Sequence, residues 1–156
     1  MREIKFRGYD YEDKCWRYGA YIKHIDFTPG MFTLEGEEEN FYKEHTKHII
    51  AFDGFSDWWM PRNIDVCTTI DEKSIGQYTG IKDKNKKEIY EGDIVKITSL
   101  DLGLDKYDDK VGTVVFNQCA FWIVFEDNSI LLWQELLEYE VIGNSYENKN
   151  FGKLKK

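Results

Sequence analysis

The residues best suited to ligate a metal are two histidines three positions apart, His45 and His48, with Glu44 and Cys67 as further possible ligands. Such a pair binds one ion only where both imidazole rings converge, as on one face of a helix. On a strand, positions three apart point to opposite faces. Residues 41–52 mix aromatic, charged and β-branched side chains, so they are ambiguous between a strand and a short helix, with a strand favoured at their end. We therefore predict no metal site here.

Nucleophilic catalysis has no local signature in this chain. No serine stands in a Gly-x-Ser-x-Gly setting, and no cysteine has the neighbours of a catalytic thiol. The glycines are too scattered to form a phosphate-binding loop. Acidic pairs such as Asp53 with Asp57 and Asp108 with Asp109 leave a metal-dependent hydrolase or nuclease as the least favoured class. We predict a protein that is not an enzyme and takes no cofactor, while a triad assembled from distant residues stays open.

Aromatic residues are the strongest signal, at 16% of the chain. Residues 53–63 are too rich in large apolar side chains for an ordinary solvated loop. Such side chains supply many of the hot spots of protein interfaces. The same segment also fits a loop that covers a core or a contact between subunits. The candidate interaction surface comprises Phe55, Trp58, Trp59, Met60, Tyr78 and Trp122.

The charge of the chain bears on nucleic-acid binding. The formal net charge is −8, which opposes attraction to a phosphate backbone. Residues 82–88 are the local exception, with four lysines against two acidic residues, and we expect this turn to be solvated. Together with aromatic side chains such as Trp122, the turn could contact a nucleic acid. Nucleic-acid binding through the face of a small barrel is therefore the alternative function.

The pattern of apolar residues predicts an all-β, β-rich fold with short helical turns, because short alternating stretches are bounded by Gly, Asp and Asn. Residues 4–9 and 16–22 alternate and predict a hairpin around a charged turn. A further strand is expected at residues 31–34. We place these elements in an N-terminal module, residues 1–77, with a variable insertion around residues 24–66.

The second half of the chain is more regular. Five strands are expected, with one 3₁₀-like turn at residues 134–139 before the last of them. This order of elements is typical of an SH3-like barrel, which we place at residues 78–148. Residues 149–156 are polar, contain four lysines and are expected to form a flexible tail. The expected strands are residues 93–98, 111–116, 120–125, 130–133 and 140–143.

The composition also bears on the compartment. The longest apolar run, residues 119–125, is far shorter than the roughly 20 residues of a membrane-spanning helix. The charged opening residues are not followed by the apolar stretch of a secretory signal. The three cysteines lie far apart, so we expect them to be reduced and mostly buried. We predict a cytoplasmic protein with no membrane partner.

Four stretches carry a shared pattern: residues 2–10, residues 74–95 with their Gly-Gln-Tyr-Thr-Gly and Glu-Gly-Asp-Ile-Val motifs, residues 113–115, and residues 139–148. Together they span nearly the whole chain, which resembles the YopX family of phage and prophage proteins. The resemblance implies a β-rich phage protein with an SH3-type barrel in its C-terminal part, and it implies no catalytic residues. Where the family usually has Asn-Gly, this chain has Asn85-Lys86, so a looser turn is expected.

These observations favour binding over turnover. An acidic chain with abundant aromatics and no assembled catalytic motif suits contacts with other proteins. We predict an accessory protein of a phage or prophage that binds an unidentified host or phage protein. The aromatic surface also exceeds what two small cores need, which predicts a homo-oligomer.

Overall fold

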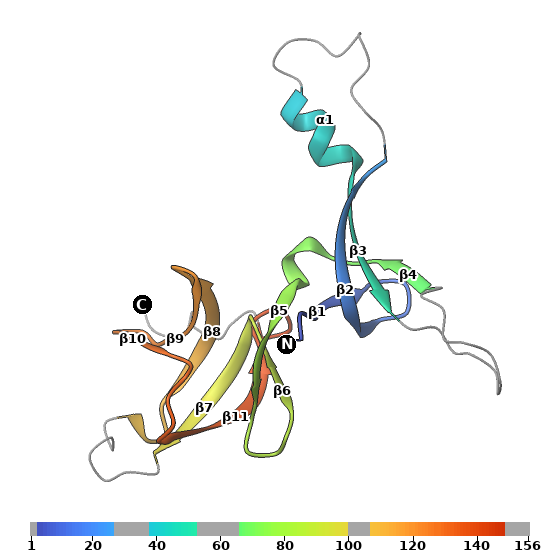
Figure 1. The fold of residues 1–156 in the computed structure, drawn as a ribbon. Coiled ribbons are helices and arrows are strands. Elements are labelled where there is room, and N and C mark those ends of the chain that lie inside the picture. Colours follow the sequence, from blue (N-terminus) through green and yellow to red (C-terminus); the bar gives the residue numbers. More distant parts are fainter. Residues whose placement is uncertain (1–2, 27–37, 53–65, 100–106, 149–156) are drawn as a thin grey trace, which may run out of the picture. The chain divides into compact units, whose positions relative to one another are not determined.

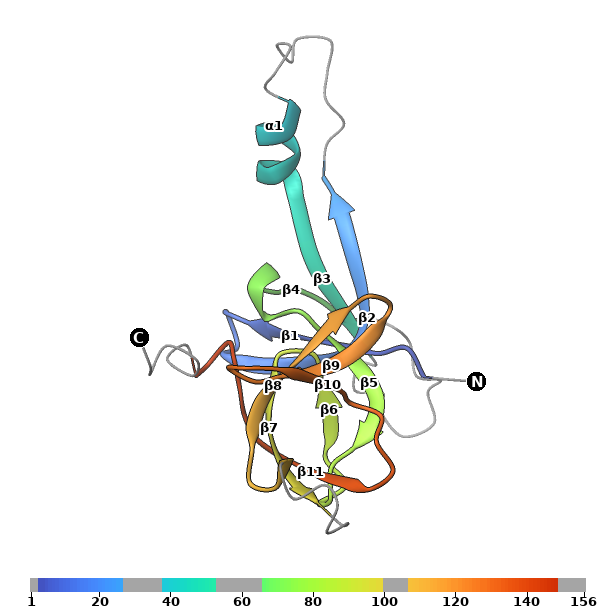
Figure 2. The same cartoon turned by 90° about the vertical axis from the view of Figure 1, so that its left-hand side faces the viewer.

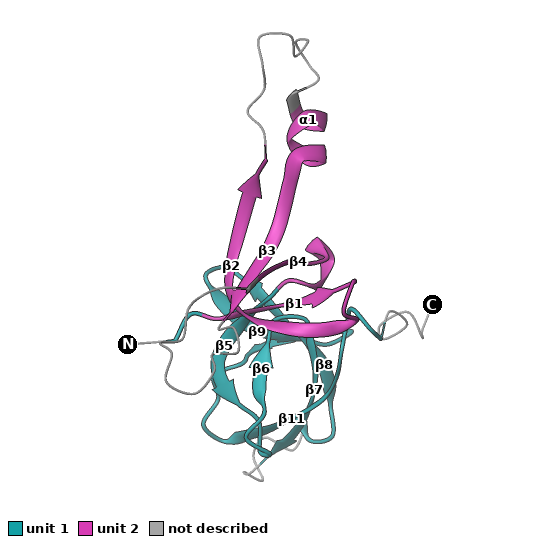
Figure 3. Cartoon of the chain, turned by 90° about the vertical axis from the view of Figure 1, so that its right-hand side faces the viewer, with its two compact units in different colours: residues 1–4, 76–156 teal, residues 5–75 magenta. Residues whose placement is uncertain are grey.

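The computed structural model describes residues 3–26, 38–52, 66–99 and 107–148. Nearly all regular structure in these ranges is antiparallel strand, with one α-helix and one 3₁₀ turn, which confirms the predicted all-β class. The chain divides into two compact units, coloured separately in Figure 3. The N-terminal unit is residues 5–75, and the C-terminal unit combines residues 1–4 with residues 76–156. That these units are independent modules stays a prediction.

The strands of the N-terminal unit pair in the order β4-β3-β2-β1. The predicted hairpin is present, because Phe6 pairs with Gly19 and Asp10 with Cys15 around a turn in which Lys14 has a φ of 53°. The elements of the N-terminal unit are β1 (Phe6–Asp10), β2 (Cys15–Ile25), α1 (Glu38–His45), β3 (Thr46–Phe52), β4 (Val66–Thr69) and the 3₁₀ turn η1 (Glu72–Ser74).

The far ends of β2 and β3 form a two-stranded ribbon that leads to α1 (Figure 2). The stretch that the sequence left ambiguous divides at Thr46, with the helix before it and the strand after it. The expected strand at residues 31–34 lies outside the described residues. The last four residues of β2 are exposed, and among the described residues this end pairs with β3 alone.

The C-terminal unit contains a five-stranded antiparallel sheet in the order β10-β9-β8-β7-β11 and a β5–β6 hairpin (Figure 1). Its last strand begins three residues earlier than expected, so that the 3₁₀-like turn is confined to residues 134–137. Whether the unit closes into an SH3-like barrel stays a prediction. The strands are β5 (Gly76–Lys82), β6 (Glu88–Tyr90), β7 (Asp93–Ser99), β8 (Val111–Asn117), β9 (Ala120–Val124), β10 (Ser129–Leu131) and β11 (Leu137–Asn144).

Alternation along these strands sends one set of side chains into a common core. Successive strands contribute β-branched residues to it, which pack well on a pleated surface. The buried members of this core are Ile89, Val95, Ile97, Val114, Ile123, Ile130, Leu132, Leu137 and Tyr139. No helix within the described ranges is long and apolar enough to cross a membrane.

Two expectations about individual residues are wrong. The cysteines are not mostly buried, because Cys67 and Cys119 are exposed and Cys15 is half-buried. Cys67 lies on β4, the outermost strand of its group, and Cys119 lies at the β8–β9 turn with a φ of 61°. The charged turn after β5 is not wholly solvated either, since Asp83 is only 6% exposed.

Candidate functional site

Four of the six candidate interaction residues, Phe55, Trp58, Trp59 and Met60, lie outside the described residues. Of the other two, Tyr78 is buried on β5, where its ring packs against that of Tyr90 with centroids 5.4 Å apart. Trp122 is half-buried on β9, and its indole N–H donates to the Asn117 carbonyl at 2.9 Å. Tyr78 lines one of the two cavities described below, whereas Trp122 lines neither of them.

The first cavity, which we call the aromatic hollow, has a volume of about 620 Å³. It is enclosed by β5, the ends of β8 and β9 that meet at their turn, and the segment that follows β10. The paired residues Phe116 and Phe121 form one wall with ring centroids 5.0 Å apart. The principal apolar lining residues are Tyr78, Ile81, Phe116, Phe121, Leu131 and Trp133.

The second cavity, which we call the charged hollow, has a volume of about 430 Å³. It lies between the β5–β6 turn and residues 132–139, which include the start of β11. Charged side chains stand at its rim, with Lys82 and Lys84 from the turn and Glu135 and Glu138 from the other wall.

Trp133 lines both hollows, together with Gly80, Ile81 and Leu132. Its side chain is 74% exposed, whereas Leu132 is 1% exposed. Side chains alternate between the two faces of an extended chain. Leu132 therefore points inward, as Ile130 does on β10, whereas Trp133 points outward, as Leu131 does. The sequence analysis missed Trp133, since the run Ile-Leu-Leu-Trp shows no polar alternation that would reveal which side chains are outside. We call the surface formed by Trp133 and the two hollows the Trp133 surface.

Asp83 holds the β5–β6 turn against β11. One carboxylate oxygen accepts the backbone N–H groups of Asn85 and Lys87 at 2.8 and 2.9 Å. The other accepts the N–H of Val141 at 3.1 Å. Within the turn Lys86 has a φ of 65°, in the left-handed region that glycine favours. Lys86 therefore takes the conformation that a glycine would have at this position, and the buried carboxylate holds the turn tight where a looser turn was expected.

Tyr139 shapes the floor of the charged hollow. Its hydroxyl donates to the Leu132 carbonyl at 2.5 Å, and burial raises the pKa of Tyr139 to about 12. Lys84 forms an ion pair with Glu140 at 2.7 Å. These polar groups are thus engaged in contacts that hold the fold.

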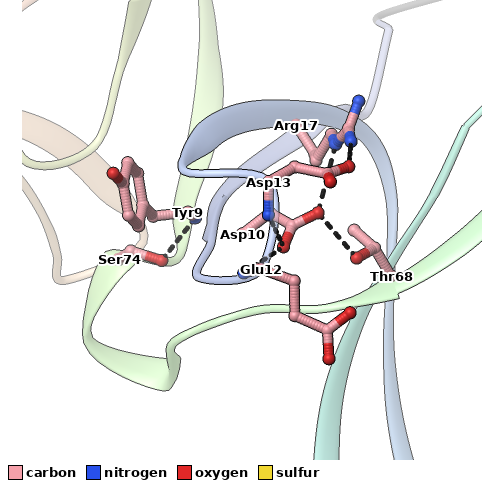
Figure 4. Close-up of polar contacts among 7 residues, drawn as sticks. All are labelled: Tyr9, Asp10, Glu12, Asp13, Arg17, Thr68 and Ser74. Carbon is pink, nitrogen blue, oxygen red and sulfur yellow. Dashed lines mark hydrogen bonds and ion pairs between the residues drawn. The ribbon is translucent and has the colours of Figure 1, made fainter.

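The N-terminal unit contains a buried carboxylate at the end of β1, Asp10 (Figure 4). One of its oxygens accepts the backbone N–H groups of Glu12 and Asp13 at 2.9 and 3.2 Å. The other accepts the Thr68 hydroxyl at 2.8 Å and the Arg17 Nε–H at 3.3 Å. Burial alone would raise the pKa of Asp10, but these hydrogen bonds outweigh it and lower the pKa.

Asp10, Asp13 and Cys15 place one potential metal-ligating atom each within 4.8 Å of one another. Asp13 also forms an ion pair with Arg17, and both oxygens of Asp10 already accept hydrogen bonds (Figure 4). The hydrogen-bond donors around Asp10 already stabilise its negative charge, as a bound cation would. The cluster therefore fits a structural role in closing the β1–β2 turn.

The two histidines of the sequence motif lie in different surroundings. His45 ends α1, and its ring lies 4.2 Å from that of Phe41. His48 lies on β3, where its Nδ1 is 2.7 Å from the Tyr21 hydroxyl and its Nε2 is 3.6 Å from a carboxylate oxygen of Glu72. The burial of Tyr21 and the nearby Glu72 charge raise the pKa of its hydroxyl, which favours the neutral phenol.

Comparison with known proteins identifies the lineage of this chain. The model of the YopX protein family matches residues 5–151. The chain belongs to the YopX family. A crystal structure of YopX from Bacillus subtilis matches with 22% identity and a TM-score of 0.48, over 96% of this chain and 97% of that chain. A crystal structure of a protein from Enterococcus faecalis matches with 24% identity and a TM-score of 0.51, over 97% of this chain and 99% of the other.

The resemblance to the YopX family seen in the sequence is thereby confirmed. The Enterococcus faecalis structure supports the fold alone, because its sequence is less than 25% identical. No curated protein matches the chain.

Proposed function

We propose that this YopX-family protein is a non-enzymatic interaction module that binds another protein chain through the Trp133 surface, and that a second copy of the same chain is its first partner. We further propose, as the family resemblance of the sequence implies, that it is an accessory protein of a phage or prophage. The observation that carries the proposal is Trp133, 74% exposed and flanked by two hollows.

Exposed tryptophan is costly unless a partner covers it. Aromatic side chains bury about 150–250 Å² each, so covering the exposed part of Trp133 is worth roughly 3 kcal/mol at about 25 cal/mol per Å². Phe116 and Leu131, 45% and 40% exposed, add apolar area beside it. Such a cluster of large side chains around a tryptophan has the composition of an interface hot spot.

Self-association can be tested with two matched variants. Trp133→Ser removes the centre of the surface, whereas Ile142→Ser removes a 50% exposed apolar side chain of β11 that lines neither hollow. Sedimentation equilibrium over a concentration series should show that the wild type and Ile142→Ser self-associate alike. Trp133→Ser should dissociate at least tenfold more readily.

A capture experiment separates the remaining function classes. The wild type and both variants are used to capture proteins from host lysate, with and without nuclease treatment. Retention of this chain or of another protein that is lost in Trp133→Ser supports the proposal. Retained nucleic acid that vanishes with nuclease and depends on Lys82 and Lys87 would favour the alternative function.

A further inference from the structure

Strand β10 offers an open edge for another strand. It is the outermost strand of the five-stranded sheet, and no strand of the described chain pairs with its outer side (Figure 1). Two hydrogen bonds fix which residues of this strand face β9: Leu132 N–H donates to Phe121 O, and Phe125 N–H donates to Asn128 O. In an antiparallel pair, hydrogen-bonded and non-hydrogen-bonded residue pairs alternate along the strands. Ser129 and Leu131 occupy the non-hydrogen-bonded positions, so their backbone N–H and C=O groups point away from β9.

The outer edge of β10 lacks the usual protection. Residues 129–133 read Ser-Ile-Leu-Leu-Trp, with no lysine or proline to discourage pairing. The opposite edge of the sheet is covered in part, since Lys84 N–H donates to Tyr139 O at 2.9 Å and Asp83 accepts the N–H of Val141. The β11 edge is thus partly hydrogen-bonded to the β5–β6 turn, whereas the β10 edge is open among the described residues. A further strand can therefore be added at β10, next to the aromatic hollow.

The charges around β10 favour a basic occupant. Residues 111–148 contain six carboxylates and no lysine, arginine or histidine, and the preceding Lys110 lies 3.9 Å from Asp127. Glu126 and Asp127 precede β10, and Glu135 follows it. A second β10 laid antiparallel on the first would bring these acidic ends together, and opposed like charges destabilise strand pairs. A partner strand that carries positive charge is therefore favoured over a second β10.

This chain itself contains a positively charged segment that could serve as the partner strand. Residues 149–156 read Lys-Asn-Phe-Gly-Lys-Leu-Lys-Lys, with four lysines, two large apolar side chains and no acidic residue. They lie outside the described residues. Phe151 is of a size that the aromatic hollow of about 620 Å³ can hold.

Reach favours pairing between copies. Residue 149 comes shortly after the end of β11, and β11 and β10 are the opposite edge strands of the sheet, with β7, β8 and β9 between them. Four strand spacings of about 4.8 Å put the two edges roughly 19 Å apart along the sheet, whereas residues 149–156 span roughly 26 Å when fully extended. Within one copy most of the segment would be used in crossing to β10, and too little would remain to lie along it.

We propose that residues 149–156 of one copy add as a strand to the outer edge of β10 in a second copy. Their lysines would face Glu126, Asp127 and Glu135, and Phe151 would enter the aromatic hollow. This inference rests on the proposed function, because it names the segment that the second copy presents to the Trp133 surface. Strand addition supplies backbone hydrogen bonds, and the side chains supply specificity.

The test compares two double charge reversals in the full chain. Lys153→Glu with Lys155→Glu alters the proposed strand, and Lys86→Glu with Lys87→Glu changes the net charge equally in the β5–β6 turn. Sedimentation equilibrium should show at least tenfold weaker self-association for the first pair and no change for the second. The wild-type association should also weaken as salt rises. A synthetic peptide of residues 149–156 should bind the wild type and dissociate its oligomer.

Edge pairing has its own variant. Leu131→Pro removes an outward N–H that pairs with nothing in the isolated sheet, so the fold should survive while peptide binding falls at least tenfold. Circular dichroism checks the fold, and Ser129→Pro repeats the test if Leu131→Pro does not fold. Self-association that is lost in Trp133→Ser but unchanged in Lys153→Glu with Lys155→Glu would overturn this inference and leave the proposed function standing. A wild type that neither self-associates nor binds the peptide would overturn this inference and the self-association on which it rests.

Discussion

Replacing Asp10 with asparagine should destabilise the N-terminal unit by about 2 kcal/mol. The Oδ2 atom of Asp10 accepts from Thr68 and from the Arg17 guanidinium, and an amide nitrogen in its place can accept from neither. A hydrogen bond to a charged group contributes about 1.5–3 kcal/mol, and a buried group left without its partner adds to the loss. The bonds to the backbone N–H groups of Glu12 and Asp13 can survive, because the asparagine carbonyl still accepts them.

The stability that Asp10 contributes should depend on pH in a defined direction. The pKa of Asp10 is lowered in the folded protein, so the unfolded chain binds the proton first as pH falls. The stabilisation is therefore present above the unfolded value of about 3.9 and is lost as pH falls through the folded pKa. Asp10→Asn should lose stability less steeply than the wild type below about pH 5, and the two should converge in acid.

The assay is urea unfolding followed by circular dichroism, repeated from pH 7 down to pH 3. Asp127→Asn is the control, because its carboxylate is 71% exposed and lies 3.9 Å from Lys110, an arrangement worth at most about 1 kcal/mol. Equal stability losses for Asp10→Asn and Asp127→Asn, or parallel pH curves for Asp10→Asn and the wild type, would refute the structural role given to Asp10.

Three further substitutions test individual features of the fold. Lys86→Gly should stabilise the protein by about 1 kcal/mol in urea unfolding, because glycine adopts the positive φ of this turn position without strain; an unchanged midpoint would contradict that conformation. Tyr139→Phe should cost about 1 kcal/mol through its lost bond to the Leu132 carbonyl, and it should remove one tyrosine from the titration near pH 12; a wild-type titration would be inconsistent with the buried phenol. Gly19→Ala should lower the thermal midpoint sharply, because its Cβ would collide with the Ala51 carbonyl, and a normal midpoint would argue against the β2–β3 register.

Sequence patterning anticipated the strands because alternation and turn residues act locally. The hairpin before residue 22 and the strands after Asp93 follow from that signal. Patterning could not show that Asp83 is buried, since its partner Val141 lies 58 positions away. Asp10 depends in the same way on Thr68, which comes from another strand.

The candidate surface shows the same limit. Aromatic content directed attention to large side chains, but it could not rank them. Tyr78 is buried and Trp133 is exposed, and this difference depends on strand register and on which face of each strand meets the core. Nothing in the local sequence around Trp133 distinguishes an inward tryptophan from an outward one.

Site-specific photo-crosslinking tests the central claim most directly. A photoreactive benzoylphenylalanine is placed at position 133 in one variant and at position 142 in another, and each is irradiated in host cells. The account predicts a discrete crosslink at position 133, to this chain or to one other protein, and little at position 142. An equal or stronger crosslink at position 142, or crosslinks at position 133 to nucleic acid alone, would contradict the assignment of the Trp133 surface to protein binding.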